Sequence, residues 1–171
     1  MSVLKQDSGK NISQMNMSLF SVGFKMDPFS VGEAVKFKAP KPGWTLKQVR
    51  VVGWNGFDGN ASSIPDSENF LIEVRDSDLN LLYRMVDTQN AYFTFPAPVL
   101  RAIDLPPVPV TDEFYVIFYD RGEMLIGMEL ENATGNSYYY NSLYSELLPV
   151  EFLDENNNTN SINWLIRAVG N

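Results

Sequence analysis

The sequence predicts an all-β protein, and more closely an antiparallel two-sheet β-sandwich of the jelly-roll type. Short segments alternate apolar and polar residues with a period of two, which is typical of strands. Turn signals built from Gly, Pro and Asn separate these segments, and no convincing long helix interrupts them. The 171 residues suit one domain. We expect it to span residues 14–171, after a flexible lead over residues 1–13 that is polar and lacks periodicity.

The first half of the chain carries the clearest alternation. In residues 33–39, Val35 and Phe37 lie on one face and Lys36 and Lys38 on the other, which indicates a strand with one wet face. The strands expected in this half span residues 18–26, 33–39, 44–53, 69–75, 81–85 and 92–95.

The strongest β signal is in residues 114–119, which are apolar or aromatic on both faces. Such a run favours the middle of a sheet over its edge. A short strand over residues 101–105 is expected to stop at Pro106-Pro107, because proline lacks the N–H that a sheet ladder needs. A turn at residues 120–123 is expected to join 114–119 to 125–130 as a hairpin.

The C-terminal part is expected to hold two further strands. The first is a short aromatic strand over residues 137–140, and one helical turn is expected in residues 141–148. An acidic, Asn-rich loop over residues 151–161 leads to the last strand, 163–169. In that strand Trp164 shares a face with Ile166, opposite to Arg167.

Composition excludes several classes of function. With 13 Lys and Arg against 21 Asp and Glu, the net charge is −8, so nucleic acid and anionic membranes are poor partners. No apolar run is long enough for a membrane span. The chain has no Cys and no His, which excludes disulfides, zinc sites on those ligands, thiol nucleophiles and imidazole bases. No motif selects a pair of catalytic carboxylates, so we expect no enzyme activity.

Asparagine points to an extracellular or cell-surface location. Five N-x-[S/T] sequons occur, more than the Ser and Thr content would give by chance, at Asn11, Asn16, Asn60, Asn132 and Asn157. Alternatively, Asn, Ser and Thr simply crowd together in polar loops. The first seven residues lack an apolar signal region, so an exported protein would have its signal or anchor upstream of this chain.

Four ordered stretches carry a resemblance to a known family. They are Ala34–Phe37 with Pro40, Phe70–Asp76 with Leu81–Tyr83, Ile103–Leu105 through Val110 to Val116, and Gly135–Tyr140 with Asn163–Arg167. In this order they resemble an accessory β-sandwich domain that is common on secreted and surface-anchored prokaryotic proteins. The resemblance implies a jelly-roll-like sandwich on an extracellular protein, and it brings no functional residues with it.

One loop has oxygen ligands at alternate positions, as a calcium loop does. Its residues are Asp76, Asp78 and Asn80. The sixth position of an EF-hand loop needs Gly and the twelfth needs Glu, but this chain has Leu81 and Asp87 there. The stretch is therefore not an EF-hand, and the choice lies between a calcium site of another kind and an Asx-rich hairpin turn.

A second loop has the ingredients of a sugar-binding surface. Sugars stack on exposed aromatic rings, and neighbouring Asn and Asp side chains bind their hydroxyls. Trp54, Asn55, Phe57 and Asp58 provide both within five residues. Alternatively, these aromatic residues close the end of the sandwich.

The outward side of the 114–119 strand is a candidate interaction face. If Phe114, Val116 and Phe118 point inward, then Tyr115, Ile117 and Tyr119 form an apolar stripe on the other side. Such a stripe must be covered by the chain itself or by a partner.

Two hypotheses about function follow. The first is a non-catalytic extracellular or cell-surface domain with a structural or protein-interaction role, whose partner would be another surface protein. The second is a carbohydrate-binding module for a surface glycan, with calcium as a possible cofactor.

Overall fold

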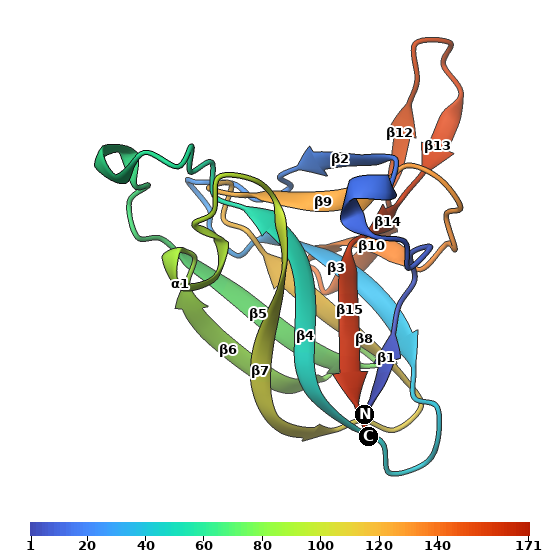
Figure 1. Cartoon of the computed structure of the whole chain (residues 1–171). Coiled ribbons are helices and arrows are strands. Elements are labelled where there is room, and N and C mark those ends of the chain that lie inside the picture. The colour runs from blue at the N-terminus through green and yellow to red at the C-terminus, as the bar shows by residue number, and fades with distance from the viewer.

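Two antiparallel sheets face each other across one hydrophobic core (Figure 1). The computed structural model describes residues 1–171. The two sheets confirm the predicted all-β class and antiparallel sandwich, while the jelly-roll connection of the strands stays a prediction.

The first sheet has seven strands in the order β1-β15-β4-β9-β14, with β2 paired to β9 and β7 paired to β4. Its strands are β1 (Ser2–Leu4), β2 (Met17–Phe20), β4 (Thr45–Trp54), β7 (Val99–Pro109), β9 (Leu125–Glu129), β14 (Asn163–Trp164) and β15 (Ile166–Gly170).

The second sheet has six strands in the order β11-β10-β3-β8-β5-β6. Its strands are β3 (Val31–Lys38), β5 (Asn69–Asp76), β6 (Leu81–Thr88), β8 (Glu113–Tyr119), β10 (Ser137–Asn141) and β11 (Glu146–Pro149). A separate pair, β12 (Glu151–Leu153) and β13 (Thr159–Ser161), projects from the body as a hairpin (Figure 1). Helical structure is limited to α1 (Asn90–Phe93) and to two 3-10 turns, η1 (Ile12–Gln14) and η2 (Ala61–Ser63).

The core forms where the alternating inner residues of both sheets meet. β8 lies between β3 and β5, as its two apolar faces predict, and it sends Phe114, Val116 and Phe118 into a cluster of 27 buried residues. Phe118 stacks on Phe70 of β5 with ring centroids 5.1 Å apart. In the last strands Trp164 and Ile166 both reach this cluster, as the alternation predicts.

Prolines do not stop β7, contrary to the sequence prediction. The strand continues to Pro109, and a shift in its register against β4 between Leu46 and Gln48 accommodates the extra residues 105–107. β7 pairs with β4 alone, so its other edge needs no N–H donors and tolerates Pro106 and Pro107.

Three other local predictions were wrong. Residues 114–119 and 125–130 do not form a hairpin, because β8 and β9 belong to different sheets and the turn after Tyr119 crosses between them. The strand expected over residues 92–95 is absent, and residues 90–93 form the short helix α1. The expected helical turn in 141–148 is the turn of the β10–β11 hairpin.

The N-terminal residues join the sandwich, whereas the sequence predicted a flexible lead over 1–13. β1 pairs with β15, so the two ends of the chain lie side by side (Figure 1). The buried carboxylate of Asp7 accepts two hydrogen bonds from Arg167, at 2.8 Å from Nε and 2.7 Å from Nη2.

Candidate functional site

The predicted interaction face on β8 is covered by the chain's own side chains. Tyr115, Ile117 and Tyr119 are all buried, in a cluster with neighbours on β3, β5 and β10. Phe29 and Leu79 pack against this cluster, and so do Tyr138 and Leu147. The expectation of a partner at this face is therefore wrong, because the stripe is already covered within the molecule.

A charged network lies on the same outer face of the sheet. The buried Glu73 carboxylate accepts hydrogen bonds from Arg75 at 2.8 Å, from Arg84 and from the Tyr119 hydroxyl at 3.0 Å. Burial pushes the pKa of Glu73 upward, but the hydrogen bonds from Arg75 and Arg84 outweigh it and lower the pKa. Burial, together with the charge of Glu73, raises the pKa of the Tyr119 phenol. This arrangement stabilises the face and offers no open binding group.

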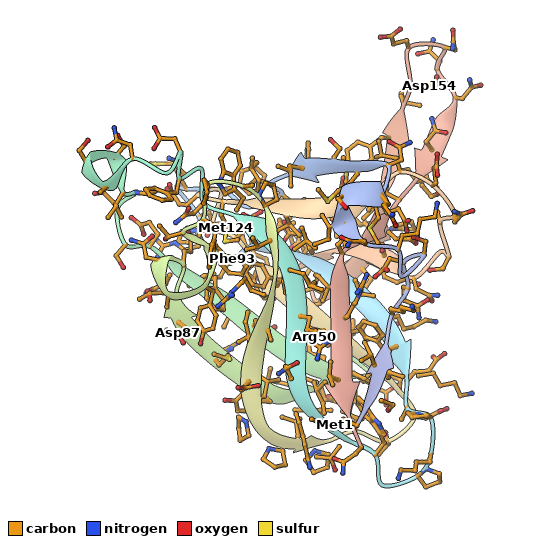
Figure 2. The ribbon with its side chains drawn as sticks, in the orientation of Figure 1. Met1, Arg50, Asp87, Phe93, Met124 and Asp154 are labelled. Carbon is orange, nitrogen blue, oxygen red and sulfur yellow. The ribbon has the colours of Figure 1, made fainter.

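The predicted calcium loop is the turn between β5 and β6. Asp76 accepts hydrogen bonds from the backbone N–H of Asp78 and Asn80, both at 2.9 Å, and from Nδ2 of Asn80 at 3.0 Å. The Asn80 side chain is the main cause that lowers the pKa of Asp76. The same pattern recurs in the β12–β13 turn, where Asp154, labelled in Figure 2, accepts hydrogen bonds from Asn156 and Asn158. No group of three acidic residues that could hold a metal is present.

The predicted sugar-binding loop is tied down by its own polar groups. The Trp54 indole N–H donates to the carbonyls of Phe57 at 3.1 Å and Phe95 at 2.9 Å. Asn55 is buried, and its Nδ2 donates to Asn90 and Thr94. These bonds fix the ring of Trp54 at the end of β4.

Trp54 and Asn55 line a small hollow of about 170 Å³, together with residues of the turn between β8 and β9. Phe57 and Asp58 are not part of its wall. Asp58 instead accepts a hydrogen bond from the backbone N–H of Asn60. The structure therefore brings together two of the four predicted residues.

A larger polar hollow of about 350 Å³ adjoins the first one and shares Asn55 and Glu123 with it. Its wall comes from four connections between strands at one end of the sandwich and consists of Lys25, Asn55, Pro65, Asp66, Glu68, Gln89 and Glu123. Sequence reasoning missed most of these residues, because no motif links them and only folding brings the connections together.

One part of the exposed apolar surface lies around β2, the edge strand beside β9. Two hollows flank the Phe20–Phe152 ring pair, whose centroids are 5.4 Å apart. The first hollow, of about 400 Å³, has no charged residue in its wall, which consists of Phe20, Ser21, Val22, Gly23, Phe24, Val31, Tyr139, Asn141 and Leu148. The second, of about 370 Å³, is mostly apolar and includes Ser18, Phe152 and Leu153, with Asp154 as its one charged residue.

The sequence assigned residues 18–26 to one strand with Phe20, Val22 and Phe24 on one face. The strand ends at Phe20, so that only Val22 is buried and both phenylalanines are exposed. The ending is explained by Asp120, whose carboxylate accepts hydrogen bonds from the N–H of Val22 and Gly23, both at 3.0 Å. The backbone turns toward Asp120 there instead of continuing along β9.

A search of protein-family models finds no match to this chain, and a search of curated proteins finds no relative. None of its helices has the length and apolar character needed to cross a membrane.

Proposed function

We propose that this chain is a non-catalytic interaction domain that binds an extended, apolar segment of a partner protein along β2. The observation that carries the proposal is a free strand edge flanked by two apolar hollows on one side. Peptides that add a strand to a sheet use backbone hydrogen bonds for affinity and side-chain pockets for specificity.

The backbone of β2 has hydrogen-bonding groups to offer. The strand pairs with β9 alone, and Leu130 donates to the Asn16 carbonyl just before it. In an antiparallel ladder the hydrogen-bonded positions alternate, so the N–H and C=O groups of Met17 and Leu19 face away from β9. A partner strand can pair with these groups.

The two hollows lie where alternate side chains of such a partner would enter. Phe20 lines the first hollow and Ser18 the second, so both open on the same face of β2. The chain has a net charge of −8, yet the first hollow has an uncharged wall. This contrast favours an apolar, uncharged partner segment over a second copy of this acidic chain.

Peptide selection tests the proposal. A displayed library of short random peptides is selected on the protein, and the affinity of the selected peptides is measured by fluorescence polarisation. Leu148→Asp changes a wall residue that is 46% exposed, and Leu81→Asp is a matched control on β6 with 44% exposure. We expect alternating apolar residues in the selected peptides, and loss of binding in Leu148→Asp alone.

Two results would contradict this function. Selected peptides that bind Leu148→Asp as tightly as the unmodified protein would place the partner elsewhere. Peptides methylated at alternate backbone nitrogens that keep full affinity would exclude strand pairing at β2.

We further propose an extracellular or cell-surface location for this domain. All five sequon asparagines are exposed, which supports their access to a glycosylating enzyme. The two-sheet antiparallel architecture also supports the resemblance to the accessory domain of prokaryotic surface proteins. Mass spectrometry of the protein from its native source tests whether the sequons are glycosylated. The reading frame upstream of Met1 tests for a signal or anchor.

A further inference from the structure

The polar hollow at the loop end of the sandwich is separate from the apolar hollows beside β2, and its wall shares no residue with theirs. Its volume of about 350 Å³ falls at the lower end of the range for small-ligand sites. Apart from Pro65, the wall consists of polar and charged side chains. Such a wall suits a ligand that is bound mainly through hydrogen bonds.

Gln89 supplies a fixed and unused acceptor to this hollow. Its side-chain Nε2 donates to the backbone carbonyls of Asn69 at 3.2 Å and Asp120 at 3.3 Å, which sets the orientation of the carboxamide. Gln89 is only 2% exposed, but its Oε1 accepts no hydrogen bond from the protein and is not sealed from solvent. Since Gln89 lines the hollow, we infer that this free oxygen is the acceptor it offers there to a hydroxyl donor.

The carboxylates around Gln89 are mostly neutralised by neighbouring cations. Lys25 lies 3.0 Å from Glu123, and Arg121 lies 3.5 Å from Glu68. Asp66 alone among the wall carboxylates has no hydrogen bond or ion pair. The hollow is therefore rich in acceptors without a strong net charge, which favours neutral donor groups over a cation.

Trp54 adds an aromatic wall next to these acceptors. It lines the small hollow that shares Asn55 and Glu123 with the polar one, and its indole N–H is held by two carbonyls. A fixed aromatic ring next to oriented acceptors is an arrangement suited to the apolar face and the hydroxyl edge of a sugar ring.

We propose that the polar hollow binds one saccharide unit of a neutral glycan. Its hydroxyl groups donate to Gln89 Oε1 and to the Asp66 carboxylate, and Lys25 donates to a ring or hydroxyl oxygen. The C–H face of the sugar packs toward Trp54. This site is independent of the peptide site at β2, so either can be disproved without the other.

Saturation-transfer NMR with four named probes tests the proposal: D-glucose, D-galactose, D-mannose and N-acetyl-D-glucosamine. We expect at least one sugar to receive saturation from the protein. Asp66→Ala should weaken the affinity for that sugar about tenfold, the usual effect of losing a hydrogen bond to a charged group. Asp78→Ala removes the same charge from the β5–β6 turn and should leave binding unchanged.

A second variant separates the hollow from general surface effects. Gln89→Met keeps the length of the side chain and removes the acceptor, and its fold is checked by circular dichroism. If it is folded, we expect it to lose the sugar signal. Absence of saturation transfer to all four sugars, or equal binding by Asp66→Ala and the unmodified protein, would overturn the proposal.

Discussion

The fully buried carboxyl group of Glu33 lies beside the Asp120 carboxylate, between the two sheets. Asp120 accepts three backbone hydrogen bonds, from Val22, Gly23 and Gly122. The Glu33 oxygens accept none. Burial raises the pKa of Glu33 well above its usual range, and the charge of Asp120 and a hydrogen bond to it raise that pKa further. We therefore expect the folded protein to keep the Glu33 proton well above the pH at which a free glutamate releases it.

This pair makes the stability of the protein fall with rising pH. The unfolded chain releases the Glu33 proton near the usual pKa of a glutamate, while the folded protein keeps it. The contribution of Glu33 to stability is therefore fully present below the unfolded pKa. Above it, the free energy of unfolding decreases by about 1.4 kcal/mol per pH unit until the folded pKa is reached. We expect Glu33→Gln, which keeps a donor toward Asp120, to remove this slope and to raise stability at neutral pH.

Urea denaturation at several pH values measures the effect. Glu146→Gln on the exposed part of β11 is the matched control and should keep the slope of the unmodified protein. Parallel pH profiles for Glu33→Gln and the unmodified protein would show that Glu33 does not hold the proton.

The Glu73 network stabilises the second sheet through its charge. Glu73→Ala leaves the guanidinium of Arg75 without its carboxylate on a largely buried face, so we expect a loss of about 3 kcal/mol in the free energy of unfolding. The pKa of Glu73 is lower in the folded protein than in the unfolded chain. The contribution of Glu73 to stability is therefore present above the unfolded pKa and is lost as the pH falls through the folded pKa.

Arg84→Met provides the comparison for this prediction. The Arg84 side chain is half exposed, so water already screens its ion pair with Glu73, and its loss should cost no more than about 1 kcal/mol. An equal loss in the free energy of unfolding in Glu73→Ala and Arg84→Met would contradict the assignment of Glu73 as the centre of the network.

The N-terminal residues are expected to contribute to folding stability. Asp7→Ala removes the buried carboxylate that binds Arg167 through two hydrogen bonds, and we expect a loss of about 3 kcal/mol. Thermal unfolding of this variant is compared with that of Asp112→Ala, which removes an exposed carboxylate of a surface ion pair. An unchanged melting temperature for Asp7→Ala would favour the flexible lead that the sequence predicted.

Removal of calcium should not destabilise the β5–β6 turn. The oxygens of Asp76 are already occupied by hydrogen bonds from Asp78 and Asn80, so a cation would have to displace them. We therefore expect the same melting temperature with calcium chloride and with EDTA. A lower melting temperature in EDTA that disappears in Asp76→Asn would instead establish a calcium site at this turn.

The sequence by itself determined most of the long strands and, within them, which side chains are buried. The alternation that places Val35 and Phe37 in the core also puts Glu33 on the inner face, two residues earlier. This is possible because a period of two is a local property of an extended backbone. The aromatic and apolar run of β8 likewise identified the central strand of its sheet.

Only the tertiary structure decided which strands pair, what covers each face and which loops meet. The same apolar pattern would suit β8 and β9 in one sheet or in two, so the sequence did not exclude their hairpin. The burial of Tyr115, Ile117 and Tyr119 depends on side chains from other strands. The pair of Glu33 with Asp120 and the hollow around Gln89 join residues far apart in the chain. Alternation encodes burial, whereas the partner of a buried group depends on long-range packing.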